Sequence, residues 1–465
     1  MLMKLREQIN SISGFRYVID ELCIHSSVGR RCLMEQEFLT EASDIEVLLS
    51  RVEIAISYQA DQRKQKGLDE IAHKLMQLRD IQGTIYSLSR HVVCPDIDFF
   101  EIKFLAILSE DIRDLIRFYQ LDDLSSPLPD LSHIVSVLDP EEKKIPHFYI
   151  YDAYSETLRE LRDRLKKETN EDAKIEIRNE SLQEEDIVRK RLSRELSPYA
   201  GGLATALELL GAIDLLLAKV KLFIQLGWSK PGSGHSVTNY MGLVHPHVLS
   251  LLGKKGEKFQ PVDIALPSLP TLITGANMAG KSVLLQGVAL AQILYQYGFY
   301  VPAQKAEICP VEKVMLSLGD AQDIRQGLSS FGAEMMCLSS IADEARQGKQ
   351  LLVLVDEPAR TTNPVEGQAI VSGLLAILSR YKIRSLVTTH YGSIDIPCRR
   401  LKVRGFREDK VNLPLQVNSL SKCVDYTLEE VSENDVPHEA IRIAEILGVN
   451  EALMTECKQF LNNTK

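Results

Sequence analysis

The chain has 465 residues, of which 45% are hydrophobic and 25% are charged. This length and composition are ordinary for a soluble globular protein of more than one domain, and they exclude a small scaffold that needs disulfides or metals for stability. The 54 Lys and Arg residues against 64 Asp and Glu residues give a formal net charge of −10. No overall positive field therefore attracts the chain to nucleic acid or to an anionic membrane.

Neither the apolar segments nor the cysteines indicate export or a membrane anchor. No segment reaches about 18 consecutive apolar residues, the length that a membrane-spanning helix needs. The first residues are polar, so we expect no secretory signal. The eight cysteines form no C-x-x-C pair, which disfavours a zinc site and a disulfide framework. Reduced cysteines are typical of the cytoplasm, so we expect a cytoplasmic protein with no membrane partner.

Residues 1–232 are predicted to form a helical domain. Leucines recur at helical spacing over 154–165, and a second periodic stretch covers 187–196. The polar run 168–172 between them is suited to a turn, so the two stretches predict a pair of antiparallel arms. Ser197-Pro198 fits either a kink or a helix end.

Beyond a Pro- and Gly-rich boundary near residue 232, short apolar runs alternate with helical patterns. This alternation predicts an α/β domain over 233–425 with a largely parallel sheet. The runs that predict buried strands are Thr271–Thr274, Val314–Leu318, Leu351–Val355 and Ser385–Thr389. Residues 426–465 return to a helical pattern. The expected fold class is therefore a helical domain followed by an α/β domain and a C-terminal helical element.

A glycine-rich segment predicts a phosphate-binding loop. Gly275-Ala-Asn-Met-Ala-Gly-Lys-Ser282 matches G-x-x-x-x-G-K-[ST], follows a predicted strand and precedes a helical run. Gly275 and Gly280 let the backbone wrap around phosphate oxygens, and the helix N-terminus supplies N–H groups. Lys281 is predicted to reach the β- and γ-phosphates of ATP, and Ser282 to ligate Mg²⁺. The competing interpretation is a glycine turn with a chance lysine.

Two carboxylates and a histidine follow predicted strands. Asp356 fits the Mg²⁺-associated acid of P-loop nucleotidases, and Glu357 is placed to polarise an attacking water. An acidic pair after a strand can instead cap a helix, but the phosphate-binding motif favours the catalytic role. His390 could contact the γ-phosphate or the water, although a lone histidine in this position is more often structural or solvated.

Several motifs together resemble the MutS family of mismatch-repair ATPases. Asn277-Met278 is similar to the residues between the glycines of that family's phosphate loop. Gly327-Leu-Ser-Ser-Phe-Gly-Ala-Glu-Met335 is similar to its signature segment, and Thr389-His-Tyr391 to its Thr-His-Tyr motif. Phe259 stands where the family stacks an aromatic ring on adenine, although a packed core Phe fits equally well.

The resemblance implies a dimeric, P-loop (ABC-like) ATPase that binds ATP and Mg²⁺, with Asn277 in the nucleotide-binding set. It also implies that Ser329, Ser330 and Glu334 contact the nucleotide of the partner subunit, in a homodimer or a heterodimer with a related subunit. Residues 24–33 and 148–162 resemble the start of the MutS core and its outgoing lever helix.

One loop departs from the family pattern. Where the pattern is Asp-Glu-x-Gly-Arg-Gly-Thr, the chain has Asp356-Glu-Pro-Ala-Arg-Thr-Thr362, without either glycine. We expect this difference to change the flexibility of the loop and its contacts across a dimer. Residues 426–465 are expected to form the helix-turn-helix element that closes the family's dimer.

Two functions fit these features. The first is DNA binding in mismatch repair or a related DNA transaction. The alternative is ATP-driven remodelling or reactivation of a protein partner without mismatch recognition. The chain shows no segment resembling the family's mismatch-reading, connector or clamp domains, so we expect DNA binding without mismatch selectivity. Basic residues on the predicted arms, at 166–167 and 189–191, are mixed with acidic ones, which favours a solvated helix face.

Overall fold

The computed structural model describes residues 3–143, 145, 147–275, 280–318, 330–391, 394–406, 424–431, 441, 444 and 448–463. It divides the chain into two compact units. We call the one formed by residues 1–21, 37–49 and 225–465 the sheet unit. The other, the helical unit, comprises residues 22–36 and 50–224.

This division differs from the predicted boundary near residue 232, because two N-terminal segments pack with the C-terminal half. The rings of Phe15 and Phe38 pack against that of Tyr297. The side-chain amide of Gln296 donates a hydrogen bond to the Leu39 carbonyl at 2.8 Å. These contacts join residues more than 250 positions apart, so local composition did not reveal them.

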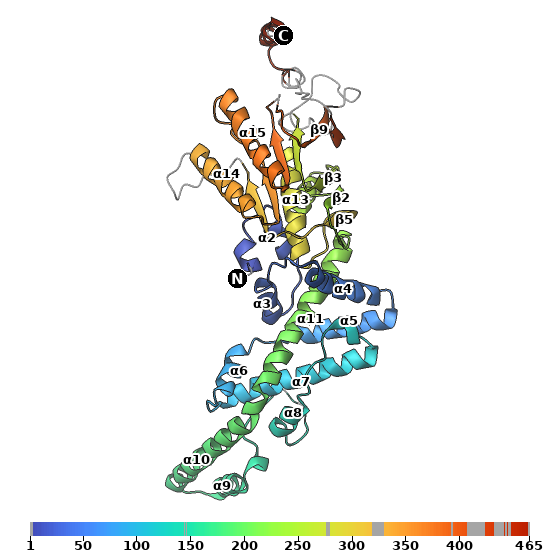
Figure 1. The fold of residues 1–465 in the computed structure, drawn as a ribbon. Coiled ribbons are helices and arrows are strands. Elements are labelled where there is room, and N and C mark those ends of the chain that lie inside the picture. Colours follow the sequence, from blue (N-terminus) through green and yellow to red (C-terminus); the bar gives the residue numbers. More distant parts are fainter. Residues whose placement is uncertain are drawn as a thin grey trace. The chain divides into compact units, whose positions relative to one another are not determined.

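The helical unit consists of helices joined mainly by short turns (Figure 1). Its helices are α3 (Ser27–Met34), α4 (Ala42–Tyr58), α5 (Gln62–Leu75), α6 (Gln82–Ser89), α7 (Asp96–Tyr119), α8 (Ser132–Leu138), α9 (Glu156–Lys167), α10 (Glu171–Leu196) and α11 (Ala200–Leu226). The short 3-10 helices are η1 (Asp122–Leu124), η2 (Asp152–Tyr154) and η3 (Ser197–Tyr199). Helices α4 and α11 each extend beyond the unit's bounds.

Helices α9 and α10 pack against each other and are joined by the polar turn at 168–170 (Figure 1). Asn170 caps α10, because its side-chain oxygen accepts hydrogen bonds from the N–H groups of Asp172 and Ala173. The predicted arms therefore correspond to two helices in contact. At Ser197-Pro198 the chain changes to the 3-10 turn η3, but Leu196, Ser197 and Ala200 all keep right-handed helical backbone and α11 begins at once, so the kink interpretation fits better than a helix end.

A buried carboxylate fixes α3 against α11. Asp214 is fully buried, and it accepts hydrogen bonds from the backbone N–H of His25 at 3.1 Å and of Ser26 at 2.7 Å. The Ser26 hydroxyl donates to the same carboxylate at 2.6 Å and caps α3 by accepting from the Gly29 N–H. The charge is thus compensated by several donors, as a buried carboxylate requires.

The sheet unit combines two sheets with helices. Its helices are α1 (Leu5–Gln8), α2 (Phe15–Asp20), α12 (Pro246–Lys254), α13 (Lys281–Gln296), α14 (Ser330–Arg346), α15 (Pro364–Arg380) and α17 (Glu451–Asn463). The smaller sheet has the order β1-β5-β2-β3, with β1 (Gly232–Ser233), β2 (Val237–Leu243), β3 (Val262–Pro267) and β5 (Lys305–Ile308). Strand β2 is antiparallel to both β3 and β5, and β1 is parallel to β5.

The larger sheet has the order β10-β9-β4-β8-β7-β6. Its strands are β4 (Pro270–Thr274), β6 (Lys313–Ser317), β7 (Leu351–Val355), β8 (Arg384–Thr389), β9 (Arg399–Phe406) and β10 (Val424–Glu430). All pairings are parallel except that of β10 with β9. The four predicted strands are confirmed within one residue at each end.

The prediction that the helical element begins at residue 426 is wrong for its first residues. Residues 424–430 form the edge strand β10, antiparallel to β9. Val424, Tyr426 and Leu428 alternate with more polar residues, a period-two pattern that suits a strand. The rest of the predicted helix-turn-helix lies largely outside the described residues, apart from α17.

Helices cover both faces of the larger sheet. Leu351, Val353 and Val355 of β7 pack in one cluster with α14 and α15, which lie side by side in Figure 1. The alternate residues Leu352 and Leu354 are equally buried, and α13 contacts β6 and β7. A parallel sheet covered in this way brings the carboxyl ends of its strands to one edge. That edge positions the site.

None of the helices in the described ranges combines the length and the apolar character that crossing a bilayer requires.

Candidate functional site

The site begins where β4 turns into α13. Gly275 follows β4 directly, and Gly280 precedes α13 with a φ of +70°, a left-handed conformation that favours glycine. Lys281, the first residue of α13, is buried, and its ammonium donates a hydrogen bond to the Gly275 carbonyl at 2.6 Å. The lysine thus links the two ends of the loop. Asn277 lies outside the described residues.

Lys281 also forms an ion pair with Glu357. Its Nζ lies 3.0 Å from Glu357 Oε1, and the two side chains are only 4% and 11% exposed. At this low exposure the attraction between the charges is screened less than on the surface. Arg360 adds a weaker contact, with Nη1 3.7 Å from Glu357 Oε2. The proposed base and the proposed phosphate-binding lysine are therefore direct neighbours.

Asp356 is held by hydroxyl groups from two other elements. The Ser282 hydroxyl donates to Asp356 Oδ2 at 2.5 Å, and the Thr388 hydroxyl donates to Oδ1 at 2.6 Å. Thr388 Oγ1 in turn accepts a hydrogen bond from the Glu357 N–H at 2.9 Å. Through these bonds the end of β8 fixes the orientation of both acidic residues at the end of β7.

The donor set at Ser282 and Asp356 suits a magnesium ion. A hydroxyl and a carboxylate oxygen in direct contact are hard oxygen donors, the kind that Mg²⁺ prefers. Mg²⁺ usually takes one or two protein oxygens and completes its shell with water and substrate phosphates. The two predicted ligands are therefore adjacent and chemically appropriate.

The loop after Glu357 has an unusual backbone. Glu357 has a φ of +44° and Ala359 a φ of +60°, both in the left-handed region. For residues with a Cβ this conformation costs roughly 1–2 kcal/mol each. It persists only where surrounding contacts determine it. Ala359 occupies the position of the first glycine in the family pattern, and it keeps a conformation that glycine would adopt freely.

The end of β8 contributes two aromatic side chains. His390 is exposed, and its ring lies against that of Tyr391 with the centroids 4.3 Å apart. Tyr391 is buried, and burial raises the pKa of its phenol, so the hydroxyl remains a donor at neutral pH. It donates to the Ala359 carbonyl at 2.8 Å. His390 therefore lies at the carboxyl edge of the larger sheet, and the neighbouring Tyr391 is hydrogen-bonded to the loop that follows Glu357.

Of the predicted signature residues, the structure shows a contact within the chain for Glu334. Its carboxylate accepts a hydrogen bond from the Ala359 N–H at 3.1 Å. Ser330 is the first residue of α14, and Ser329 lies outside the described residues. A contact of Glu334 with a partner's nucleotide stays a prediction.

Phe259 lies on a segment attached to β10. Phe259 is half-buried. The amide of the next residue, Gln260, donates to Asp425 Oδ1 at 2.9 Å and accepts from the Tyr426 N–H at 3.2 Å. The Tyr426 ring lies beside Gly280, where an added Cβ would approach it to 3.0 Å. Strand β10 therefore connects the Phe259 segment to the start of α13.

Sequence reasoning missed several residues that shape the site: Thr388, Tyr391, Gln260 and Tyr426. Tyr391 belongs to the Thr-His-Tyr motif and Thr388 lies two residues before His390, so the motif and the strand end were the available signals, although no role followed from them. Gln260 and Tyr426 carry no motif. Their contacts connect segments about 165 residues apart and emerge only in the folded chain.

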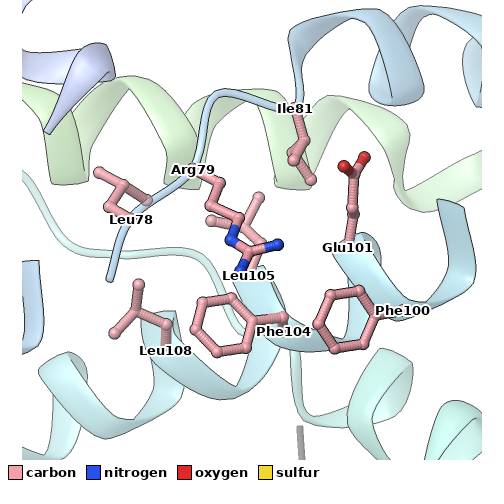
Figure 2. A pocket seen from close by; sticks show the side chains of 8 residues that line it. All are labelled: Leu78, Arg79, Ile81, Phe100, Glu101, Phe104, Leu105 and Leu108. Carbon is pink, nitrogen blue, oxygen red and sulfur yellow. The ribbon is translucent and has the colours of Figure 1, made fainter. Parts of the chain in front are cut away.

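A separate pocket lies in the helical unit. Figure 2 shows that Arg79 lies over the rings of Phe100 and Phe104, with its guanidinium carbon 5.8 and 5.9 Å from their centroids. Glu101 accepts a hydrogen bond from the Thr84 hydroxyl at 2.6 Å. The residues lining this pocket are Leu78, Arg79, Ile81, Phe100, Glu101, Phe104, Leu105 and Leu108. This mainly apolar lining lacks the phosphate-binding and acidic groups of the first site.

The site thus combines a glycine loop end, a buried lysine and two carboxylates at the carboxyl edge of an α/β sheet. In a comparison with known proteins, residues 271–465 match the family model described as MutS domain V. The predicted resemblance to the MutS family is confirmed for this C-terminal part of the chain.

Individual relatives show the same similarity. The chain is 31% identical over 293 residues to Endonuclease MutS2 of Carboxydothermus hydrogenoformans, covering 62% of this chain and 36% of that protein. It is 35% identical over 233 residues to DNA mismatch repair protein MutS of Paracoccus denitrificans, covering 49% and 26%. A third match, to DNA mismatch repair protein MutS of Thermus thermophilus, is 30% identical over 264 residues and covers 56% and 30%. The chain therefore spans about a third of the length of these relatives.

Proposed function

We propose that the chain binds ATP with Mg²⁺ and hydrolyses it at the site formed by Lys281, Ser282, Asp356 and Glu357. The observation that carries this proposal is a pair of direct side-chain contacts, Lys281 with Glu357 and Ser282 with Asp356, between two neighbouring residues at the start of α13 and two at the end of β7. Steady-state release of phosphate from ATP, with and without Mg²⁺, tests it.

Each side chain has a distinct role in the proposed reaction. Lys281 moves from Glu357 toward the β- and γ-phosphates, which releases the carboxylate of Glu357 to accept a proton from the attacking water. Ser282 and Asp356 would hold Mg²⁺, which neutralises charge on the phosphates. Thr388 fixes the positions of Asp356 and Glu357, because its hydroxyl donates to the Asp356 carboxylate and accepts from the Glu357 N–H. His390, which is exposed at the end of β8, is proposed to contact the water or the γ-phosphate.

The purine is proposed to lie against Phe259, on the segment that Gln260 fastens to β10. An aromatic ring offers stacking that suits a planar base. Gly275, Gly280 and Asn277 would surround the phosphates with backbone N–H groups.

We infer that the chain acts in a DNA transaction as a dimer, because its relatives are named for mismatch repair or as MutS2 endonucleases. Met336 of α14 and Val365 of α15 are 64% and 77% exposed. These apolar side chains favour burial against a second subunit, either an identical copy or a related chain. In that dimer Ser329, Ser330 and Glu334 would face the partner's nucleotide.

The full-length chain is therefore expected to sediment as a dimer at micromolar concentration. Replacing Val365 with Asp should shift it toward monomer, since a charge would enter the apolar contact. Sedimentation velocity with and without ATP measures this. A wild-type chain that remains a monomer in both conditions would contradict the dimer.

Two basic residues on the arms of the helical unit, Arg189 and Lys166, are paired with carboxylates. Arg189 contacts Asp96 and Asp186 at 2.7 Å each, and Lys166 contacts Asp163 at 2.9 Å. Such pairs reduce the net attraction that phosphate contacts depend on. This observation favours the second candidate function, ATP-driven remodelling of a protein partner.

We predict that the chain does not discriminate a single mismatch in an otherwise perfect duplex. A mismatch reader must kink the duplex and recover that cost through an inserted side chain and groove contacts. Any binding through the arms should be weak, sensitive to salt and independent of sequence. Competition between matched and mismatched duplexes of equal length, at near-physiological salt, measures the ratio. A preference of about tenfold, roughly 1.4 kcal/mol, would overturn the prediction.

A further inference from the structure

Both backbone polar groups of Ala359 are bound by side chains from other elements. The Ala359 N–H donates to Glu334 Oε1 of α14 at 3.1 Å. Its carbonyl accepts from the hydroxyl of Tyr391, just beyond β8, at 2.8 Å, and makes a longer hydrogen bond of 3.4 Å with the Thr362 N–H. Ala359 is fully buried, so water does not replace either bond, and a buried backbone group without a partner is strongly disfavoured. The two side chains therefore act as a clamp on one residue.

The surroundings leave space for this clamp. A Cβ added to Gly367 of α15 would lie 2.1 Å from the Tyr391 hydroxyl oxygen, so the absence of a side chain at residue 367 permits the hydrogen bond to Ala359. The Tyr391 N–H also donates to the Thr389 hydroxyl at 3.1 Å, which fixes the turn after β8. Helix α14, helix α15 and the end of β8 thus converge on the loop.

The clamp is close in the chain to the proposed base. Only Pro358 separates Ala359 from Glu357, and its ring fixes φ and limits how far the two residues move independently. Both flanking residues have positive φ values. Removing the hydrogen bonds at Ala359 would allow its backbone to relax to a commoner conformation. That relaxation would shift the Glu357 carboxylate away from Lys281 and from the water it serves.

We propose that Glu334 and Tyr391 are positioning residues that hold Ala359 in the left-handed conformation and thereby aim Glu357 at the attacking water. The inference rests on the proposed ATP hydrolysis and assigns to Glu334 a role within its own subunit. It explains how the chain keeps a glycine-like loop geometry without the glycine of the family pattern.

The test is the substitution Tyr391→Phe, which removes the hydroxyl and keeps the ring. The expected result is a kcat for ATP hydrolysis about tenfold lower, with the Kd for MgATP within about twofold of wild type. Adding Ala359→Gly to the same chain should recover most of the lost rate, because glycine adopts a positive φ without the clamp. A purely structural role of the hydroxyl would not predict this rescue.

Tyr154→Phe is a matched control, because the Tyr154 hydroxyl donates to the Val137 carbonyl at the same distance of 2.8 Å within the helical unit. Its kcat should equal that of wild type. Hydrogen–deuterium exchange of the peptide spanning residues 356–364 reads the clamp without any turnover. Exchange should be faster in Tyr391→Phe and unchanged in Tyr154→Phe.

Unchanged exchange in Tyr391→Phe would overturn the clamp, whatever the activity. Faster exchange with an unchanged kcat, or a loss of kcat that Ala359→Gly does not rescue, would overturn the positioning of Glu357. If the wild-type chain hydrolyses no ATP, the proposed function fails and the positioning role fails with it. The exchange measurement then still decides whether the clamp itself exists.

Discussion

Replacing Glu357 with Gln is expected to slow ATP hydrolysis by about 10²–10⁴-fold, the range that a positioned general base contributes. The side-chain amide has nearly the same size but does not accept a proton from water. Binding of MgATP should persist and tighten modestly, because Lys281 no longer has to leave an ion pair that is 3.0 Å long and poorly exposed. Phosphate release and calorimetric titration with MgATP measure the two effects separately.

Glu344→Gln is the control for this charge change. Glu344 lies in α14 and forms ion pairs with Lys313 and Lys349 at 2.8 and 2.5 Å. Lys313 is the first residue of β6, so these ion pairs lie at the amino edge of the sheet, opposite the site. The control should hydrolyse ATP at the wild-type rate. An equal rate in Glu357→Gln would remove Glu357 from the catalytic role.

The second large effect concerns the stability of the helical unit. Lys103 of α7 is 1% exposed and its Nζ lies 2.8 Å from Asp139 Oδ1, which is itself buried. The ammonium also donates to the His147 carbonyl and to the Tyr151 hydroxyl, each at 3.1 Å. Replacing Lys103 with Met is expected to cost about 3–5 kcal/mol in the free energy of unfolding, because the Asp139 charge stays buried without its cation.

Urea denaturation followed by circular dichroism measures this cost. The single tryptophan, Trp228, lies in the sheet unit, so its fluorescence reports the unit without the substitution and serves as an internal control. The double variant Lys103→Met with Asp139→Leu should recover much of the loss, since an apolar pair removes the uncompensated charge. If Lys103→Met lowers the free energy of unfolding by less than about 1 kcal/mol, this buried ion pair stabilises the unit no more than an exposed ion pair does.

The parts of the fold and site that local patterns encode could be predicted from the sequence. The glycine-rich motif places Lys281 and Ser282 at a helix start, and the apolar run before Asp356 places the acidic pair at the end of a buried strand. Parallel strands then bring both to one edge, and there the structure shows the contacts Lys281–Glu357 and Ser282–Asp356, which the sequence patterns did not predict.

Contacts between distant segments could not be predicted in this way. Thr388 fastens the acidic pair only because β8 lies beside β7. The missing glycine at residue 359 suggested altered flexibility, whereas Glu334 and Tyr391 hold the loop in a glycine-like conformation. Residues 426–430 were assigned to the helical tail because a seven-residue strand gives a weak periodic pattern next to a long helical one.

The most direct test of the account is the rate of phosphate release from ATP by the wild-type chain, measured with Mg²⁺ and again after chelation with EDTA. The account predicts release in the presence of Mg²⁺, and a fall to the level of the Glu357→Gln variant or below when the metal is removed, because Ser282 and Asp356 would hold the ion on the phosphates. Release that is independent of Mg²⁺, or no release above that of a protein-free control, would contradict it.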